Sequence, residues 1–247
     1  MAEPKKVGDG KCVGLNQDGI EEVFATNYLG HHLMYRLLEP MLQKSKRAAR
    51  VIQTSSLASF TSYSYRVATN LETLNGCSES YANKKGANKA YGQSKLAQIL
   101  WSNYVTKRNG PESNIYANSF SPGRVFTPIW DKGLENKFVV QDGGGESNVP
   151  WIARTFMEWL KGTMWSAEEG ALTGLFLGVE VDRLMKENIR GQYFHPQSQR
   201  VINDLAMDEE LQKHLWEFSE QLVKKYLEVT ATPTDDNDNI RFAEETA

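Results

Sequence analysis

The chain has 247 residues, of which 40% are apolar and 24% charged, and its formal net charge is -3 at pH 7. That length and composition fit one globular domain with a substantial core, and the weak net charge gives no nucleic-acid footprint. Two cysteines exclude a disulfide framework. The four histidines show no zinc-ligand spacing, so no metal is expected, and His31 and His32 are predicted to lie on a helix surface. Without a signal-like apolar core or a run of roughly 18 apolar residues, the sequence predicts a cytoplasmic protein with no transmembrane segment.

The first predicted element is a long helix over residues 19 to 43. Apolar residues recur there at helical spacing, and Asp18 with Glu21 forms a capping pattern in front of them. Proline has no amide hydrogen to donate, so Pro40 is expected to kink or end this helix.

The rest of the chain predicts alternating strands and helices. The β-branched run "RVIQTSS" (residues 50 to 56) predicts a buried strand, and residues 57 to 88 have no sustained period and predict a long loop. The later elements are, in order, a helix at 89–108, a strand at 114–123, a helix after a capping box at Ser166 and Glu169, a short strand at 191–196 and a helix at 208–229.

This order predicts a Rossmann-like, doubly wound parallel α/β sheet. The predicted domain covers residues 17 to 229. Residues 1 to 16 are expected to be irregular, and the acidic residues 230 to 247 are expected to be disordered.

Two Tyr-x-x-x-Lys pairs compete for a chemical role, Tyr91 with Lys95 and Tyr81 with Lys85. Side chains four residues apart share one face of a helix, and an ammonium beside a phenol favours the phenolate. Such a tyrosine can donate a proton to a carbonyl oxygen or accept one from an alcohol. Spacing alone does not choose between the two pairs.

Ligand sites in doubly wound folds lie outside the carboxyl ends of the strands. Ser55 and Ser56 end the first predicted strand, and Ser121, Pro122 and Gly123 end the second. A serine hydroxyl in such a place could orient a substrate oxygen, although each of these residues alone is as well explained by backbone capping or by an ordinary turn.

Four blocks, "ATNYLGHHLM", "RVIQTSSLAS", "AYGQSKLAQIL" and "YANSFSPGRVFTP", resemble the short-chain dehydrogenase/reductases in order and spacing. The block "LWEFSEQLV" resembles the retinol-dehydrogenase-like and protochlorophyllide-reductase-like branch, and the resemblance covers roughly residues 17 to 225. It selects Tyr91 over Tyr81, because Tyr91 has the serine before the lysine and the family distance to Pro122.

The resemblance implies a catalytic set of Asn27, Ser56, Tyr91 and Lys95. Asn27 would hold the lysine and a relay water, Ser56 would contact the substrate oxygen, and Tyr91 would be the acid and base. The residues implied in binding NAD(P), with NADP(H) preferred, are Tyr91, Lys95, Pro122, Gly123, Val125 and Thr127.

The sequence departs from the family in one large respect. The family's first strands and its T-G-x-x-x-G-x-G turn, which bring the cofactor pyrophosphate to a helix N-terminus, are absent from the 247 residues. We therefore expect a truncated form of an active enzyme, with a degenerate, inactive relative and a partner chain that supplies the missing half as alternatives. In each case we expect an exposed sheet edge at the Ser56 strand and weak or absent cofactor binding by this chain alone.

The leading hypothesis is an NAD(P)-dependent oxidoreductase that interconverts a carbonyl and an alcohol on an apolar, retinoid-, steroid- or lipid-like substrate. A role like that of a 3-ketosteroid reductase is an alternative substrate class. A non-catalytic binding or scaffold protein is the alternative from another functional class, and a homo-oligomer is a further expectation.

Overall fold

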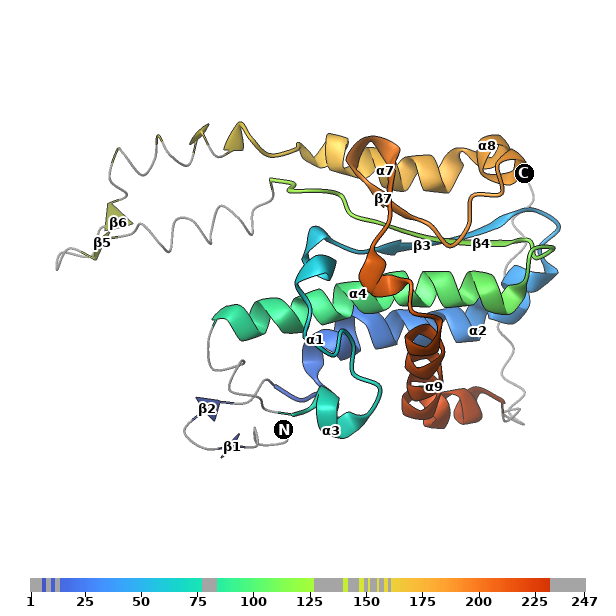
Figure 1. Ribbon diagram of the computed structural model, residues 1–247, viewed down its shortest axis with the longest axis horizontal. Helices are drawn as coiled ribbons and strands as arrows, with labels where there is room; N and C mark the ends of the chain where they lie inside the picture. Colours follow the sequence, from blue (N-terminus) through green and yellow to red (C-terminus); the bar gives the residue numbers. More distant parts are fainter. Residues whose placement is uncertain are drawn as a thin grey trace, which may run out of the picture.

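The computed structural model of the chain describes residues 14–76, 84–126 and 161–231, and in addition residues 6–7, 10–11, 140–141, 147–148, 151, 155 and 158–159. Its main body is a four-stranded sheet with helices on both faces (Figure 1). Helices α2 (Gly30–Lys44) and α4 (Lys84–Asn109) lie on one face, and α7 (Ala167–Val179) lies on the other. This arrangement confirms the predicted doubly wound α/β class.

The sheet has the strand order β3-β4-β7-β8. Strands β3 (Ala49–Thr54), β4 (Ile115–Phe120) and β7 (Tyr193–His195) run parallel, as predicted. Strand β8 (Gln199–Val201) pairs antiparallel with β7 and was not predicted, because three mostly exposed residues carry no apolar period. All six residues of β4 are buried, as expected of an inner strand.

The amino-terminal helical segment differs from the prediction at both ends. It begins at Glu22 with α1 (Glu22–Phe24), where the Glu21 side chain accepts hydrogen bonds from two amides of the first turn. Asp18 is not the cap; its carboxylate binds Lys225 and Tyr226 on α9 instead. Pro40 neither ends nor interrupts α2, which continues to Lys44.

A π-helical turn (Ala25–Leu29) joins α1 to α2. Single π-turns inside α-helices are rare and frequent at functional sites. This one carries Asn27, a member of the predicted catalytic set, so the irregularity falls on a residue of interest.

The predicted loop between β3 and α4 contains more structure than expected. A 3₁₀ helix, η2 (Leu57–Thr61), follows β3 directly, and α3 (Leu71–Leu74) follows later. Helix α4 begins at Lys84, five residues before the predicted start at 89. Tyr81, half of the competing pair, lies outside the described residues.

The long helix α9 (Glu209–Ala231) packs across α2 and α4 and closes the core on that side of the sheet (Figure 1). The remaining elements are β1 (Lys6–Val7), β2 (Gly10–Lys11), β5 (Val140–Gln141), β6 (Ser147–Asn148), α8 (Val181–Lys186) and the short 3₁₀ turns Pro196–Ser198 and Asp204–Ala206. None of the helices in the described part is long and apolar enough to cross a membrane.

His32 corrects a sequence prediction. It was expected on a helix surface, but it is fully buried at the junction of α2, α4 and α9. Its Nδ1 atom accepts a hydrogen bond of 3.0 Å from the Trp101 indole, and its Nε2 lies 2.8 Å from the Glu220 carboxylate. His31, in contrast, is exposed as predicted.

Candidate active site

Helix α4 presents Tyr91 and Lys95 on the same face, one turn apart. The Tyr91 side chain is 40% exposed, and the Lys95 ammonium nitrogen lies 5.5 Å from the centre of its ring. A cation at this distance from an aromatic face is attracted to it, and it also stabilises negative charge on the phenol oxygen. The geometry therefore permits the proton chemistry that the sequence predicts for this pair.

The Lys95 ammonium is partly buried at the end of β3. It donates hydrogen bonds to the Thr54 carbonyl oxygen at 2.8 Å and to Gln98 Oε1 at 3.4 Å. Burial lowers the pKa of Lys95 from 10.5 to about 8. An ammonium has three donors, so one remains for a substrate or cofactor hydroxyl.

Asn27 is joined to the Tyr91–Lys95 turn through two side chains. Its Nδ2 donates to the Ser94 hydroxyl at 3.1 Å, and Ser94 in turn donates to the Tyr91 carbonyl at 2.8 Å. The main-chain carbonyl of Asn27 accepts a hydrogen bond from Gln98 Nε2 at 2.7 Å, and Oε1 of the same Gln98 amide accepts one from Lys95. Gln98 thus connects Asn27 to Lys95. Sequence reasoning missed it, although a polar residue one turn beyond Lys95 on this face was a signal.

Ser56 lies at the carboxyl end of β3 and caps the amino end of η2. Its hydroxyl accepts a hydrogen bond of 3.2 Å from the Ala58 amide. Within the described residues no hydrogen bond joins Ser56 to Tyr91, so its predicted substrate contact is left untested.

Gly92 sets how closely η2 approaches α4. A Cβ atom at this position would lie 2.6 Å from the Ala58 carbonyl oxygen and 3.1 Å from that of Thr61, which is too close for any other residue. Because Gly92 follows Tyr91 directly, its missing side chain lets the Ser56 segment pack beside the Tyr91 turn. Sequence reasoning missed Gly92; the signal was a glycine inside a helix, where glycine is otherwise unfavourable.

Two buried hydroxyl groups fix the strand end beneath this site. Ser55 Oγ donates to the Lys95 carbonyl at 2.7 Å, and Tyr193 Oη donates to the Ser56 carbonyl at 3.1 Å. Burial raises the pKa of Tyr193, although hydrogen bonds with the hydroxyls of Ser59, Ser121 and Ser55 oppose the shift. Tyr193 therefore remains a neutral donor that holds the Ser56 backbone.

The turn after β4 has the shape that its Pro-Gly sequence predicts. Gly123 has a φ of 82°, and a Cβ there would lie 2.6 Å from Pro196 Cγ and 2.8 Å from Trp165. Val125 forms an isolated bridge with Trp165 and packs against α7. Thr127, the last predicted cofactor residue, lies outside the described residues.

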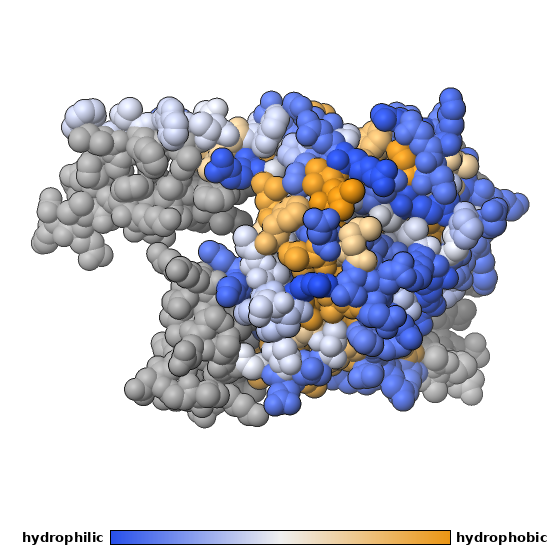
Figure 2. Space-filling model, viewed as in Figure 1, coloured by the Kyte–Doolittle hydropathy of each residue, from blue (hydrophilic) through white to orange (hydrophobic). Residues whose placement is uncertain are grey.

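Exposed apolar and aromatic side chains lie on η2, which packs against α4. Leu57 and Phe60 of η2 are 40% and 42% exposed, close to the value for Tyr91. The Phe60 ring centre lies 6.1 Å from that of His195, edge to face. Figure 2 shows apolar residues gathered on this face at the level of the sheet, between α7 and α4.

The described residues fit one end of a dinucleotide cofactor and not the other. Lys95 keeps a free donor, and the Gly123 turn lies after the neighbouring strand, which suits a nicotinamide riboside. Within the described part of the chain no glycine-rich turn follows a strand and opens a helix, so nothing there could cradle a pyrophosphate.

Comparison with known proteins identifies relatives of this chain. Short-chain dehydrogenase TIC 32 A, chloroplastic, from Brassica napus is 30% identical over 215 residues, which are 85% of this chain and 59% of that protein. Retinol dehydrogenase 14 from Mus musculus is 30% identical over 84% of this chain and 54% of its own length. Polyprenol dehydrogenase from Homo sapiens is 28% identical over 81% of this chain and 53% of its own length.

The chain thus spans little more than half the length of these relatives. No family model matches it. The fold is that of a doubly wound α/β protein. Among such proteins, the chain is a homologue of the short-chain dehydrogenase/reductases, including retinol dehydrogenases.

Proposed function

We propose that this chain is the catalytic part of an NAD(P)-dependent oxidoreductase of the short-chain type. It interconverts a carbonyl and an alcohol on an apolar substrate. The observation that carries the proposal is the Lys95 ammonium, partly buried and 5.5 Å from the Tyr91 ring at the carboxyl end of the sheet.

In this function Tyr91 moves the proton. Its hydroxyl donates to the substrate oxygen during reduction and accepts the proton from the alcohol during oxidation. Lys95 stabilises the phenolate left behind, and its lowered pKa leaves it charged at neutral pH, where that charge is needed. Asn27 positions the lysine through Gln98.

Ser56 is proposed to donate a hydrogen bond to the same substrate oxygen. Its hydroxyl accepts from the Ala58 amide, so its own hydrogen is free to point elsewhere. Gly92 and Tyr193 hold its backbone beside the Tyr91 turn. A donor fixed in advance stabilises negative charge on the reacting oxygen.

The proposed cofactor is NAD(P), and a bound nicotinamide would supply or accept the hydride. Lys95 would hold the nicotinamide ribose, and Pro122, Gly123, Val125 and Thr127 would line the ring. The absence of a pyrophosphate cradle in the described part supports weak binding by this chain alone, and NADP(H) is the form of the cofactor that we propose.

The proposed substrates are long apolar alcohols and the corresponding carbonyl compounds. Leu57 and Phe60 are exposed apolar side chains on η2, which packs against the turn after Tyr91. Two relatives are named for retinol and polyprenol, both apolar alcohols, which supports the same class.

Turnover with NADPH or NADP⁺ and a panel of retinoid, steroid and long-chain carbonyl or alcohol substrates tests this proposal. We expect slow turnover at high cofactor concentration, abolished by Tyr91→Phe. Tyr226→Phe on α9 is the matched control, because this tyrosine is 41% exposed and lies on a different element. Equal activity of the wild type and Tyr91→Phe would refute the proposed role.

Calorimetry with NADPH separates the enzyme from the scaffold alternative. Weak binding that Lys95→Met abolishes supports the oxidoreductase. Complete absence of binding and of turnover supports a non-catalytic role. Tight equimolar binding would show that the cofactor site is more complete than we propose.

A further inference from the structure

His195, the last residue of β7, carries a buried nitrogen without a partner. Its Nε2 atom is buried and makes no hydrogen bond within the described part of the chain. Buried polar groups are rarely left unpaired, so this one needs a partner that the described residues do not supply. Burial also lowers the pKa of the imidazole, which is therefore neutral at neutral pH, with one donor nitrogen and one acceptor nitrogen.

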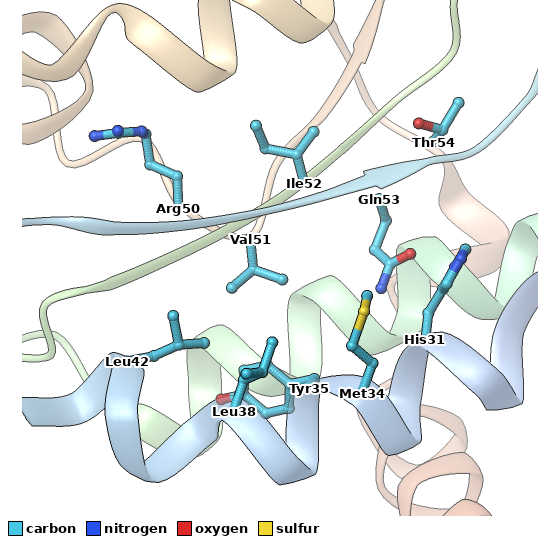
Figure 3. A pocket seen from close by; sticks show the side chains of 10 residues that line it. All are labelled: His31, Met34, Tyr35, Leu38, Leu42, Arg50, Val51, Ile52, Gln53 and Thr54. Carbon is cyan, nitrogen blue, oxygen red and sulfur yellow. The ribbon is translucent and has the colours of Figure 1, made fainter. Parts of the chain in front are cut away.

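The register of the sheet places His195 on the same face as Tyr91. Gln53 points from β3 toward α2, into a groove of about 380 Å³ (Figure 3). Gln53 pairs with Ser119 of β4, and Ser119 pairs with Tyr193 of β7. Directly paired residues point to one face of a sheet, and so do residues two apart in a strand. His195 therefore points to the face that α2 and α4 cover, at the carboxyl end of the strands.

Two segments that bound the candidate active site contact His195 and the residue after it. The imidazole lies edge to face with the Phe60 ring of η2, with ring centres 6.1 Å apart. A Cβ at Gly123 would lie 2.6 Å from Pro196 Cγ, so Pro196 packs against the turn that follows β4. The end of β7 thus contacts both η2, which Ser56 caps, and the turn proposed to line the nicotinamide.

The backbone that follows His195 has an uncommon conformation. Gln197 and Ser198 have φ values of 61° and 57°, which residues other than glycine rarely adopt. The Thr173 hydroxyl of α7 holds this turn: it donates to the His195 carbonyl at 3.1 Å and accepts from the Ser198 amide at 3.1 Å. Backbone of this kind clusters at functional sites, and here it fixes the place of the imidazole.

The sheet also separates His195 from the reacting oxygen. β4 lies between β3 and β7, and neighbouring strands are about 4.8 Å apart, so the two outer strands are on the order of 10 Å apart. Across that gap the Tyr193 hydroxyl reaches the Ser56 carbonyl at 3.1 Å. An imidazole is shorter than a phenol, so His195 falls short of the oxygen that Ser56 is proposed to bind.

We propose that His195 binds a second oxygen of the substrate, a hydroxyl group remote from the carbonyl that reacts; this rests on the proposed function. A hydroxyl both donates and accepts, so it pairs with Nε2 in either tautomer. Phe60, 42% exposed beside the imidazole, contacts the apolar frame between the two oxygens. The favoured substrates are then hydroxylated apolar carbonyl compounds, such as a steroid with an oxygen at each end, rather than a retinoid with one oxygen.

A purely structural imidazole is the alternative. The rings of Phe60 and Tyr193 both lie edge to face with His195, and an N–H group can point at an aromatic face. In that case the substitution His195→Phe would lower the stability of the chain and would not change its choice between substrates.

Michaelis constants for matched substrates test the proposal. With NADPH, decanal and dodecanal are compared with their ω-hydroxy forms, and a 3-ketosteroid with the same steroid that has a hydroxyl at the far end of its rings. For at least one pair the wild type should have a KM about three- to tenfold lower for the hydroxylated form, as one hydrogen bond provides. kcat should differ little within the pair.

Three variants show whether His195 causes that difference. His195→Phe keeps a ring but no nitrogen, and it should raise the KM of the hydroxylated form to that of the plain one. His195→Gln keeps a polar group near the position of Nε2 and should retain part of the preference. His214→Phe, at an exposed position of α9, is the matched control and should retain all of it.

Imidazole nitrogen NMR measures the same contact without turnover. The chain has four histidines, so the His195 signals can be assigned by their loss in His195→Phe. Decanediol should shift the His195 nitrogen signals more than decanol does, and neither should shift those of His214.

Equal KM values within every pair, or a preference that survives in His195→Phe, would overturn the proposal. A His195 signal that decanediol leaves unmoved would overturn it as well, whether or not any substrate is turned over. A lower urea midpoint of His195→Phe, with equal changes of KM for both members of a pair, would assign the imidazole a structural role instead. A shift by decanediol in a chain without turnover would support the His195 contact and contradict only the proposed function.

Discussion

The polar groups around the two halves of α4 differ in how fully they are hydrogen-bonded. Around Trp101, in the second half, polar groups form a chain of contacts: the indole donates to His32, His32 contacts the Glu220 carboxylate, and the Arg36 guanidinium lies 2.9 Å from the same carboxylate. Around Tyr91, in the first half, the phenol is exposed and the partly buried ammonium of Lys95 keeps an unused donor.

The residues that stabilise the fold and the residues proposed for chemistry thus lie in different halves of one helix. A fully paired buried network rigidifies a fold, whereas a partly buried charge with spare hydrogen-bonding capacity costs stability and is typical of functional sites. Substitutions in the second half should therefore lower the free energy of unfolding, and those at Lys95 and Tyr91 should lower activity without lowering stability.

Trp101→Ala should have the largest effect on stability. The side chain is 1% exposed and packs edge to face on Tyr35, with ring centres 4.9 Å apart. Removing a buried aromatic costs about 3–5 kcal/mol, and here it also leaves His32 Nδ1 without its donor. Urea denaturation measures the loss; a change below about 1 kcal/mol would contradict the importance of this cluster.

Gly92→Ala should have the next largest effect on stability. The new Cβ would meet the Ala58 carbonyl oxygen at 2.6 Å, so η2 must move away from α4, at a cost of about 1–3 kcal/mol. Gly30→Ala is the control, because its Cβ would lie 3.5 Å from the nearest atom, the Ala25 carbonyl oxygen. The control should be neutral or stabilising by up to about 1 kcal/mol. Equal effects of the two substitutions would contradict the close approach.

Acid should lower the free energy of unfolding through protonation of His32 in the unfolded state. Burial lowers the pKa of this imidazole, and the contact with Glu220 opposes the shift only in part. Because the folded pKa is below the unfolded value of about 6.5, the unfolded state takes up the proton first and stability falls as pH drops below that value. The slope should be about 1.4 kcal/mol per pH unit at most, from this one group.

Thermal unfolding between neutral and mildly acidic pH measures that slope. His32→Gln should remove it, and His214→Gln, an exposed position on α9, should leave it unchanged. A wild-type slope that survives in His32→Gln would assign the acid sensitivity to another group.

Lys95→Met should raise the free energy of unfolding at pH 7, by about 1 kcal/mol. Burial lowers the pKa of Lys95 from 10.5 to about 8, so the charged form is disfavoured in the folded chain. That cost is complete below pH 8 and disappears as the pH rises toward 10.5, so wild type and variant should converge there. Lys213→Met, at an exposed position of α9, should show no gain in stability. A loss of stability in Lys95→Met would contradict the account.

Ser94→Ala should have the smallest effect. It removes the hydrogen bond from Asn27 Nδ2 and its own bond to the Tyr91 carbonyl. Each is worth about 0.5–1 kcal/mol, solvent can replace part of the first, and the higher helix propensity of alanine offsets about 0.5 kcal/mol, which leaves a net loss below about 1 kcal/mol. A stability loss above about 2 kcal/mol would mean that the Asn27 link is structural.

Much of this architecture was predictable because it follows from periodicity. Strand β4 and the helices α4 and α9 have strong apolar patterns, and the Ser166–Glu169 capping box marked the start of α7 correctly. The extra strand β8 has no such pattern because it is short and exposed.

The details around the site were less predictable because they depend on contacts between distant segments. Gly92 matters only because η2 lies against it, and Gln98 only because Asn27 comes from another helix. His32 looked like a surface residue because α9, which buries it, lies almost 190 residues later (the separation from Glu220 is 188).

The measurement that tests the central claim most directly is the paired comparison of turnover and stability for Tyr91→Phe. Loss of the hydroxyl from an exposed phenol should leave the urea midpoint within error, while the turnover of an apolar alcohol or carbonyl with NADP(H) falls by about 10²-fold or more. Unchanged turnover, or a large loss of stability, would contradict the assignment of the first half of α4 to chemistry.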